Sequence, residues 1–173
     1  VSLQQWNSML VSADSGRWVP AVGDSDSHTT ADPIGLPQTV VLADDLSREA
    51  ILDGVRAGRC YVAESADIAV TFAASGDGRS AGIGERLEVS DDTTVEVELT
   101  VNGVSDGLVR LVTDEGWMLE TPLPASGTVT WSTTPAVSSY VRAEIRRPGP
   151  RYFEPMAAFT NPIFLGGRAC TSA

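Results

Sequence analysis

His28 is the only histidine of the chain, and it follows Asp26 by two positions within the polar run 24–30. In an extended segment, residues i and i+2 project from the same side, with about 6–7 Å between their backbones. A carboxylate and an imidazole placed in this way can both bind one metal ion, or bind two adjacent ions. Such oxygen and nitrogen ligands suit Zn²⁺, Mn²⁺ or Fe²⁺. We therefore take Asp26 and His28 as the candidate metal ligands.

The same residues also have a purely structural interpretation. An Asp-x-His pair commonly caps a turn, and a single histidine is often an exposed side chain rather than a ligand. Asp24, Ser25 and Ser27 are candidates for orienting His28 or a bound phosphate. They are equally suited to accept hydrogen bonds from the loop backbone. We favour the loop role for Ser27 and keep Asp24 as a neighbour of the site.

To about residue 66, the predicted order of elements is helix–strand–loop–strand–helix–strand. The first helix follows a capping box that starts at Ser2, and it ends at Gly16. The apolar runs 18–23 and 39–43 indicate buried strands, and residues 47–58 have the caps and apolar stripe of a second helix. This order is typical of α/β proteins, and the first run would deliver its polar residues at a barrel mouth.

The pattern changes after residue 66, where apolar and polar residues alternate. The clearest strand is 95–101, and Asp114-Glu115-Gly116 predicts a hairpin turn. Regularly spaced short strands without helical periodicity favour an antiparallel, immunoglobulin-like β-sandwich over residues 67–173. The predicted fold class is therefore α+β, with a separate α/β segment over 1–66. We expect the C-terminal strand to return towards residues 60–63.

Composition excludes two classes of partner. The 173 residues contain 12 basic side chains, all arginine, against 23 acidic ones, which gives a net charge of −11. Such a chain would be repelled by phosphate backbones, so we expect no nucleic-acid partner. No apolar run approaches the roughly 18–20 residues that span a bilayer, so we expect no membrane span. Because the chain starts at Val1 without signal-peptide features, we expect it to be a segment of a longer protein.

Cys60 and Cys170 are the only cysteines. They are either two separate thiols or one disulfide that ties the C-terminal tail to an early strand. The disulfide would require an oxidising compartment, such as the periplasm or the exterior. Separate thiols are compatible with the cytoplasm.

Arginine and tryptophan residues provide further candidates for binding. Arg56 and Arg59 suit a phosphate, although their place at a helix C-terminus already accounts for them. Trp117 and Trp131 are candidates for a sugar-stacking platform, but alternation with polar neighbours favours the sandwich core. The alternative to an enzyme is therefore a non-catalytic β-sandwich module that binds a partner such as a carbohydrate.

The run Val22-Gly23-Asp24-Ser25-Asp26-Ser27-His28 resembles the last metal-binding motif of PHP-type metal-dependent phosphoesterases, in particular the CehA/McbA-like group. The similarity continues through residues 34–37, 39–41 and 51–62. The segment Thr160-Asn161-Pro162-Ile163-Phe164 resembles the one that closes such proteins. The middle of the sandwich carries no such motif.

This resemblance implies a distorted seven-stranded barrel that holds two or three metal ions and hydrolyses phosphate esters. The family's last motif supplies an aspartate and a histidine, which map onto Asp26 and His28. The remaining ligands come from earlier motifs, which a chain with one histidine cannot supply. We therefore expect residues 1–66 to be the terminal βα units of such a barrel. A missing N-terminal portion or a second chain would complete the site, and the isolated chain would be inactive.

Overall fold

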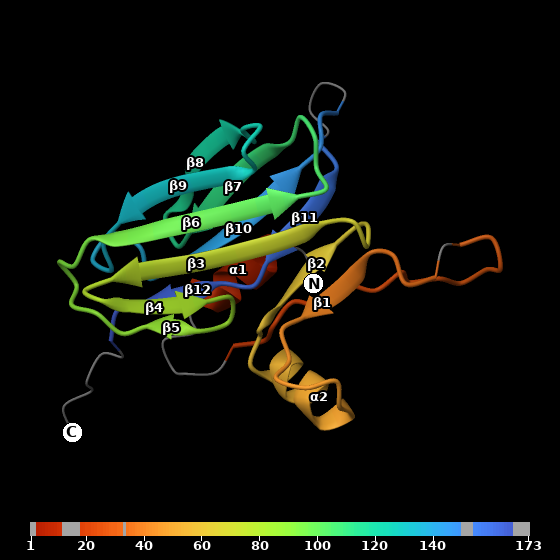
Figure 1. Ribbon diagram of the computed structural model, residues 1–173, viewed down its shortest axis with the longest axis horizontal. Coiled ribbons are helices and arrows are strands. Elements are labelled where there is room, and N and C mark those ends of the chain that lie inside the picture. The colour runs from red at the N-terminus through yellow and green to blue at the C-terminus, as the bar shows by residue number, and fades with distance from the viewer. Residues whose placement is uncertain (1–2, 12–17, 33, 150–153, 168–173) are drawn as a thin grey trace.

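Two β-sheets face each other across one hydrophobic core, and two short helices lie outside them (Figure 1). The structure is a computed structural model that describes residues 3–11, 18–32, 34–149 and 154–167. Within these ranges the helices are α1 (Leu3–Val11) and α2 (Arg48–Arg56). The strands are β1 (Gln38–Val41), β2 (Cys60–Ala63), β3 (Ala69–Gly76), β4 (Arg79–Gly82), β5 (Arg86–Leu87), β6 (Val95–Asn102), β7 (Leu108–Thr113), β8 (Gly116–Pro122), β9 (Thr128–Thr133), β10 (Tyr140–Arg146), β11 (Met156–Thr160) and β12 (Ile163–Leu165).

The described strands divide into a large and a small sheet. The large sheet has the order β1-β2-β11-β10-β12-β5, with β7 paired to β10 and β8 paired to β7. The small sheet has the order β4-β3-β6-β9. Neighbouring strands pair in antiparallel fashion, except β12 and β5, which are parallel. Figure 1 shows the small sheet in front of the large one.

Alternating side chains fill the space between the sheets. On β6, the odd-numbered residues from Val95 to Val101 are buried, whereas Glu96 and Glu98 are exposed. On β10, Val141, Ala143 and Ile145 enter the same core from the large sheet. The predicted antiparallel, sandwich-like strand content is thus confirmed, as is the hairpin turn between β7 and β8.

The expected barrel units in the first third of the chain are wrong. Parallel βα units would require β1 and β2 to run in the same direction. Instead they pair antiparallel, with Val40 opposite Tyr61, and β2 pairs antiparallel with β11. The α+β prediction of PHP-like barrel units followed by an immunoglobulin-like sandwich is therefore replaced by a β-rich fold. An apolar run shows that a strand is buried but not which strand lies beside it.

Residues on both sides of position 66 contribute to the large sheet. The predicted return of a C-terminal strand is confirmed, because Thr160 of β11 lies opposite Tyr61 of β2. The division into domains 1–66 and 67–173 stays a prediction. Residues 18–23, expected as a strand, carry no regular secondary structure, so no barrel mouth is formed there.

Both predicted helices are present. At α2, Ser47 Oγ accepts a hydrogen bond from Ala50 N and caps the first turn, as expected. α1 packs Trp6 and Leu10 against Tyr140 and Phe164, on the outer face of the large sheet. Its predicted cap Ser2 and end Gly16 lie outside the described residues. In the described part of the chain, neither helix has the length and apolar character needed to cross a membrane.

Candidate functional site

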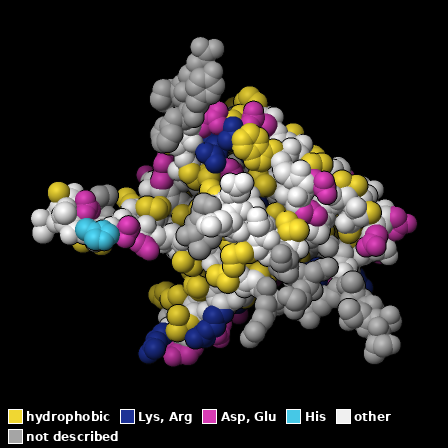
Figure 2. Space-filling model, turned by 180° about the vertical axis from the view of Figure 1, so that it is seen from behind, with side chains coloured by type: hydrophobic (Ala, Val, Ile, Leu, Met, Phe, Trp, Pro, Cys, Tyr) yellow, Lys and Arg dark blue, Asp and Glu magenta, His cyan; other side chains and the backbone are white. Residues whose placement is uncertain are grey.

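Asp26 and His28 lie on a loop, residues 24–32, which we call the arm. Figure 1 shows this loop projecting beyond β1, away from both sheets. Figure 2 shows the histidine beside acidic side chains on the same projection. The Asp26 side chain is 91% exposed and that of His28 is 76% exposed. Both groups are therefore open to solvent and to anything that docks on the arm.

A turn, and not an extended strand, brings the two side chains together. Asp26 has a φ of +47°, in the left-handed region that aspartate tolerates better than most residues. Asp24 Oδ1 accepts a hydrogen bond of 2.6 Å from Asp26 N and supports this turn. His28 Nδ1 lies 3.8 Å from Asp26 Oδ1. The predicted proximity of the pair is confirmed, but the extended geometry behind it was wrong.

The ring of His28 contacts the backbone of the same turn. Its Nδ1 lies 2.5 Å from the backbone carbonyl oxygen of Asp26. A carbonyl oxygen only accepts, so Nδ1 carries the proton and donates. In this arrangement Nε2 is the ring nitrogen that a metal ion could bind, as in many metal-binding histidines whose second nitrogen donates to a carbonyl. The arm thus offers one imidazole nitrogen and one carboxylate.

Asp32 closes the arm. Its Oδ2 accepts hydrogen bonds from His28 N at 2.8 Å and from Thr29 N at 2.7 Å. These two backbone hydrogen bonds, that of His28 first, hold the pKa of Asp32 below its usual value. Neither the residue type nor the spacing of Asp32 indicated this role. Ser27 Oγ donates to Ser25 Oγ, which agrees with the favoured loop role of Ser27.

Side chains from three distant elements hold the segment that leads into the arm. Trp6 Nε1 of α1 donates to Val19 O at 2.8 Å. Ala21 N donates to Asn161 Oδ1, and Asn161 Nδ2 donates back to Ala21 O. Alternate residues 19, 21 and 23 are thereby bonded as in a strand, with side chains in place of a partner backbone.

The third bonded residue of this segment is Gly23. Its N–H donates to Thr39 Oγ1 of β1, and that hydroxyl donates to Gly23 O, both at 2.9 Å. A Cβ at position 23 would lie 2.4 Å from Val62 Cγ1 on β2. The close approach therefore requires glycine, and the base of the arm is fixed to the large sheet.

Asn161 also contacts Cys60. Its Nδ2 lies 3.0 Å from Cys60 O and 3.1 Å from Cys60 Sγ. Burial raises the pKa of the Cys60 thiol, although the hydrogen bond from Asn161 opposes this. Cys170, the other half of the disulfide considered above, lies outside the described residues. The only sequence signal for Asn161 was its place in the segment 160–164.

The pair has no third metal ligand in the described part of the chain. Within 3–11, 18–32, 34–149 and 154–167, no three His, Cys, Asp or Glu side chains come together as a metal site. Two ligands hold a divalent ion weakly, since stable sites use at least three protein ligands. A metal ion bound here would need further ligands from outside the described residues.

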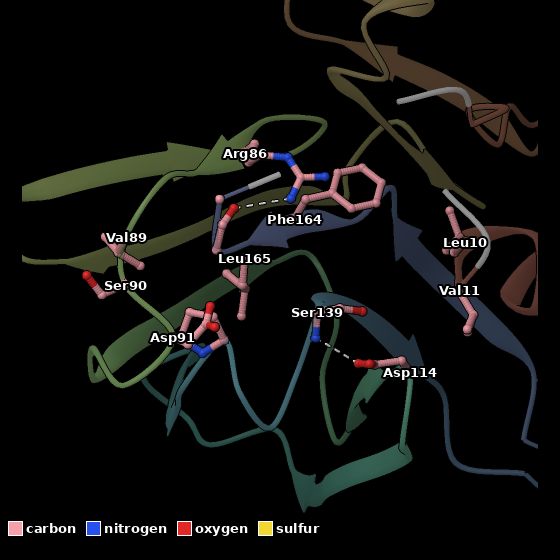
Figure 3. Close-up of a pocket in the computed structure, with 13 residues that line it drawn as sticks. Leu10, Val11, Arg86, Val89, Ser90, Asp91, Asp114, Ser139, Phe164 and Leu165 are labelled. Carbon is pink, nitrogen blue, oxygen red and sulfur yellow. Dashed lines mark hydrogen bonds between the residues drawn. The ribbon is translucent and has the colours of Figure 1, made fainter. Parts of the chain in front are cut away.

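A cavity of about 630 Å³ lies elsewhere, between the end of α1 and the loops around β5 and β12 (Figure 3). Arg86 lies over the ring of Phe164, 5.1 Å from its centroid, and donates to Gly166 O. On another wall, Asp114 accepts a hydrogen bond from Ser139 N. Neither Asp26 nor His28 lines this cavity, so the two sites are separate.

The two tryptophans do not form a platform. Trp117, on β8 of the large sheet, is 63% exposed, so the expectation that it lies in the core is wrong. Arg110 covers its ring at 4.2 Å from the centroid. Trp131, on β9 of the small sheet, packs against the core as expected.

The similarity of residues 22–28 and 160–164 to PHP-type phosphoesterases stays a prediction. The chain matches no protein-family model, and no curated protein and no solved structure is significantly similar to it. The arm's functional interpretation therefore depends on its own geometry and on the short motifs.

Proposed function

We propose that this chain supplies Asp26 and His28 as two ligands of a divalent metal site in a metal-dependent phosphoesterase. The remaining ligands come from a second chain or from an N-terminal portion of the same protein. The observation that carries the proposal is the exposed turn that brings the Asp26 carboxylate and the His28 ring together, with His28 Nδ1 3.8 Å from Asp26 Oδ1.

The charge of the arm also favours a cation. Asp24, Asp26 and Asp32 lie within nine residues, on a chain with a net charge of −11. Asp24 and Asp32 each use one oxygen for backbone N–H groups. The Asp26 carboxylate is 91% exposed and therefore accessible to a ligand.

In the complete site, the metal would activate a water as hydroxide and polarise the ester. Zn²⁺, Mn²⁺ and Fe²⁺ are the ions that suit the donor set. The choice of phosphate esters as the substrate class rests on the sequence resemblance. Because two ligands do not fix an ion with an open position, the isolated chain is expected to be inactive.

Apolar side chains beside the arm support a partner surface. Val22 and Ile34 flank the arm in sequence and are 56% and 87% exposed. Exposed apolar side chains at the base of a projecting loop offer a surface on which a partner chain can pack. A chain that docks there would bring its own ligands towards Asp26 and His28.

The test uses the single histidine as a reporter. Because His28 is the only histidine, its imidazole gives one set of ring signals in a proton NMR spectrum. Titration with Zn²⁺ should shift these signals, and Mn²⁺ should broaden them. Asp26→Ala should weaken the apparent affinity at least tenfold. Asp92→Ala removes an aspartate from a distant turn. It is the matched control and should leave the apparent affinity for the metal unchanged.

Two results would contradict the proposal. One is a His28 signal that responds equally to metal in wild type and Asp26→Ala. The other is hydrolysis of p-nitrophenyl phosphate by the isolated chain with Mn²⁺ or Zn²⁺, at a rate that Asp26→Ala abolishes. The second result would show a complete site and overturn the expectation that ligands are missing.

A further inference from the structure

A second site lies where the antiparallel pair of β1 and β2 diverges from the small sheet. These two strands are connected through α2, and we refer to the pair as the β1–β2 hairpin. Figure 1 shows the hairpin running obliquely to β3 and β4. Between them is a cleft of about 380 Å³, lined mainly by β1, β2, β3 and the end of β4. This volume is within the range of about 300–1,000 Å³ that small-molecule sites occupy. We call it the hairpin cleft.

Two contacts beside the cleft hold its elements together. The hydroxyl of Tyr61 donates to Ile68 O and accepts from Val70 N, which joins β2 to β3 at the inner end. On another side, Gly84 lies against Gly58, where an added Cβ would meet the Gly58 carbonyl carbon at 2.5 Å. The cleft therefore lies between elements that are fixed to each other.

The lining is mainly apolar, and Arg59 is its one charged residue. Val40 lies opposite Tyr61 in the hairpin, so these side chains share the face that looks into the cleft. Leu42 and Arg59 follow at two-residue spacing and extend the same face outwards. The other wall includes Phe72 of β3 and Ile83 after β4. One guanidinium thus lies near the mouth of an otherwise largely apolar cavity.

Arg59 is incompletely paired. Its Nε is buried and has no hydrogen-bond acceptor in the described part of the chain. Its Nη2 lies 3.6 Å from Asp44 Oδ2, which is too long for a hydrogen bond, and Asp44 is 82% exposed. A buried donor without an acceptor is unfavourable. An anionic oxygen that approached the Nε–Nη2 edge of the guanidinium would remove this cost.

We propose that the hairpin cleft binds a small anionic amphiphile, namely an acyl chain that ends in a carboxylate. The chain lies between Val40, Tyr61 and Phe72, and the carboxylate pairs with Arg59. The apolar walls select the acyl chain and the single guanidinium selects the anionic head. This site is independent of the arm and of the function proposed for it.

The test compares three probes by isothermal titration calorimetry. Decanoate carries both features, decan-1-ol lacks the charge, and inorganic phosphate lacks the chain. Decanoate should bind at least tenfold more tightly than either of the others. Arg59→Gln should weaken decanoate binding at least tenfold. Arg56→Gln removes the same charge from an exposed arginine of α2, and should change the affinity by less than twofold.

A second variant locates the acyl chain. Val40→Phe fills the hairpin cleft and should also weaken decanoate binding at least tenfold, with an unchanged circular dichroism spectrum as the check on folding. Asp26→Ala should bind decanoate as wild type does, which separates this site from the arm. The proposal is overturned if decanol binds as tightly as decanoate, if Arg59→Gln binds normally, or if wild type binds no decanoate at millimolar concentration.

Discussion

The arm and the outer face of β10 both carry several charged side chains, but these are exposed on the arm and buried on β10. On β10, Arg142, Glu144 and Arg146 form what we call the charge cluster. Glu144 is 4% exposed and pairs with both arginines, Arg142 at 2.8 Å and Arg146 at 2.7 Å. On the arm, the side chains of Asp26 and His28 are largely exposed.

The difference separates charged side chains that are paired inside the fold from charged side chains that are open to solvent. Trp6 of α1 lies over the Arg142 guanidinium, and Asn7 accepts from its Nε, so α1 seals the charge cluster. Charged side chains enclosed in this way pair with one another and are not accessible to a ligand. The Asp26 carboxylate and the His28 imidazole are instead exposed, so a ligand can reach them.

Removing the shared carboxylate should have the largest effect. Glu144→Gln leaves Arg142 and Arg146 without their counter-charge in a buried position, which should lower the free energy of unfolding by about 3 kcal/mol or more. Urea unfolding followed by circular dichroism measures this. Glu98→Gln, on the exposed face of β6, is the control and should change it by less than about 0.5 kcal/mol. Equal effects of the two changes would show that the charge cluster is not structural.

The Glu144 carboxylate should also make the stability of the protein depend on pH. Burial alone would raise the pKa of Glu144, but Arg142 and Arg146 more than offset it and hold the pKa below the usual 4.5. A depressed folded-state pKa gives stability that is present above the unfolded value and is lost as the pH falls through the folded value. Above about pH 5.5, Glu144 is ionised in both the folded and the unfolded protein, so the difference in unfolding free energy between wild type and Glu144→Gln should be constant. Below pH 4.5 this difference should shrink.

Local patterns predicted the elements of this protein better than their arrangement. Alternation over 95–101 and the cap at Ser47 depend on neighbouring residues, and both were confirmed. The pairing of β2 with β11 joins residues about a hundred positions apart. No period within 60–63 specifies that partner, so an α/β barrel was an equally consistent interpretation of the same apolar runs.

The candidate site divides in the same way. Asp26 and His28 were found from residue type and spacing, because they are neighbours in sequence. The groups that support them were not, because Asn161 and Thr39 act through the backbone of Ala21 and Gly23. Side chains that replace a strand partner leave no periodic signal. Arg59 was noticed as a helix-end arginine, and only the tertiary structure shows that it lines a cleft.

Asn161→Ala should have an intermediate effect and tests whether the arm is fixed to the large sheet. The change removes a buried amide that bonds Ala21 N, Ala21 O and Cys60 O. Leaving such groups unpaired should cost about 1–3 kcal/mol in unfolding free energy. Amide hydrogen exchange at Ala21 should also accelerate. Asn102→Ala, at the exposed end of β6, should do neither, and normal protection at Ala21 in Asn161→Ala would show that the base of the arm does not depend on this residue.

Asp32→Ala should have the smallest effect on the whole protein and a specific one on the arm. The carboxylate accepts from His28 N and Thr29 N at the surface, so its loss should free these two amides to exchange faster while the unfolding midpoint stays unchanged. Because those hydrogen bonds lower the pKa of Asp32 below 3.8, wild type should keep both amides protected as the pH falls to that value and lose the protection below it. If the arm owes its shape to Asp32, the variant should also weaken the response of His28 to Zn²⁺. A normal Zn²⁺ response with unprotected amides would mean that the turn at Asp26 alone sets the geometry of the pair, and the two ligands would then need no support from the rest of the arm.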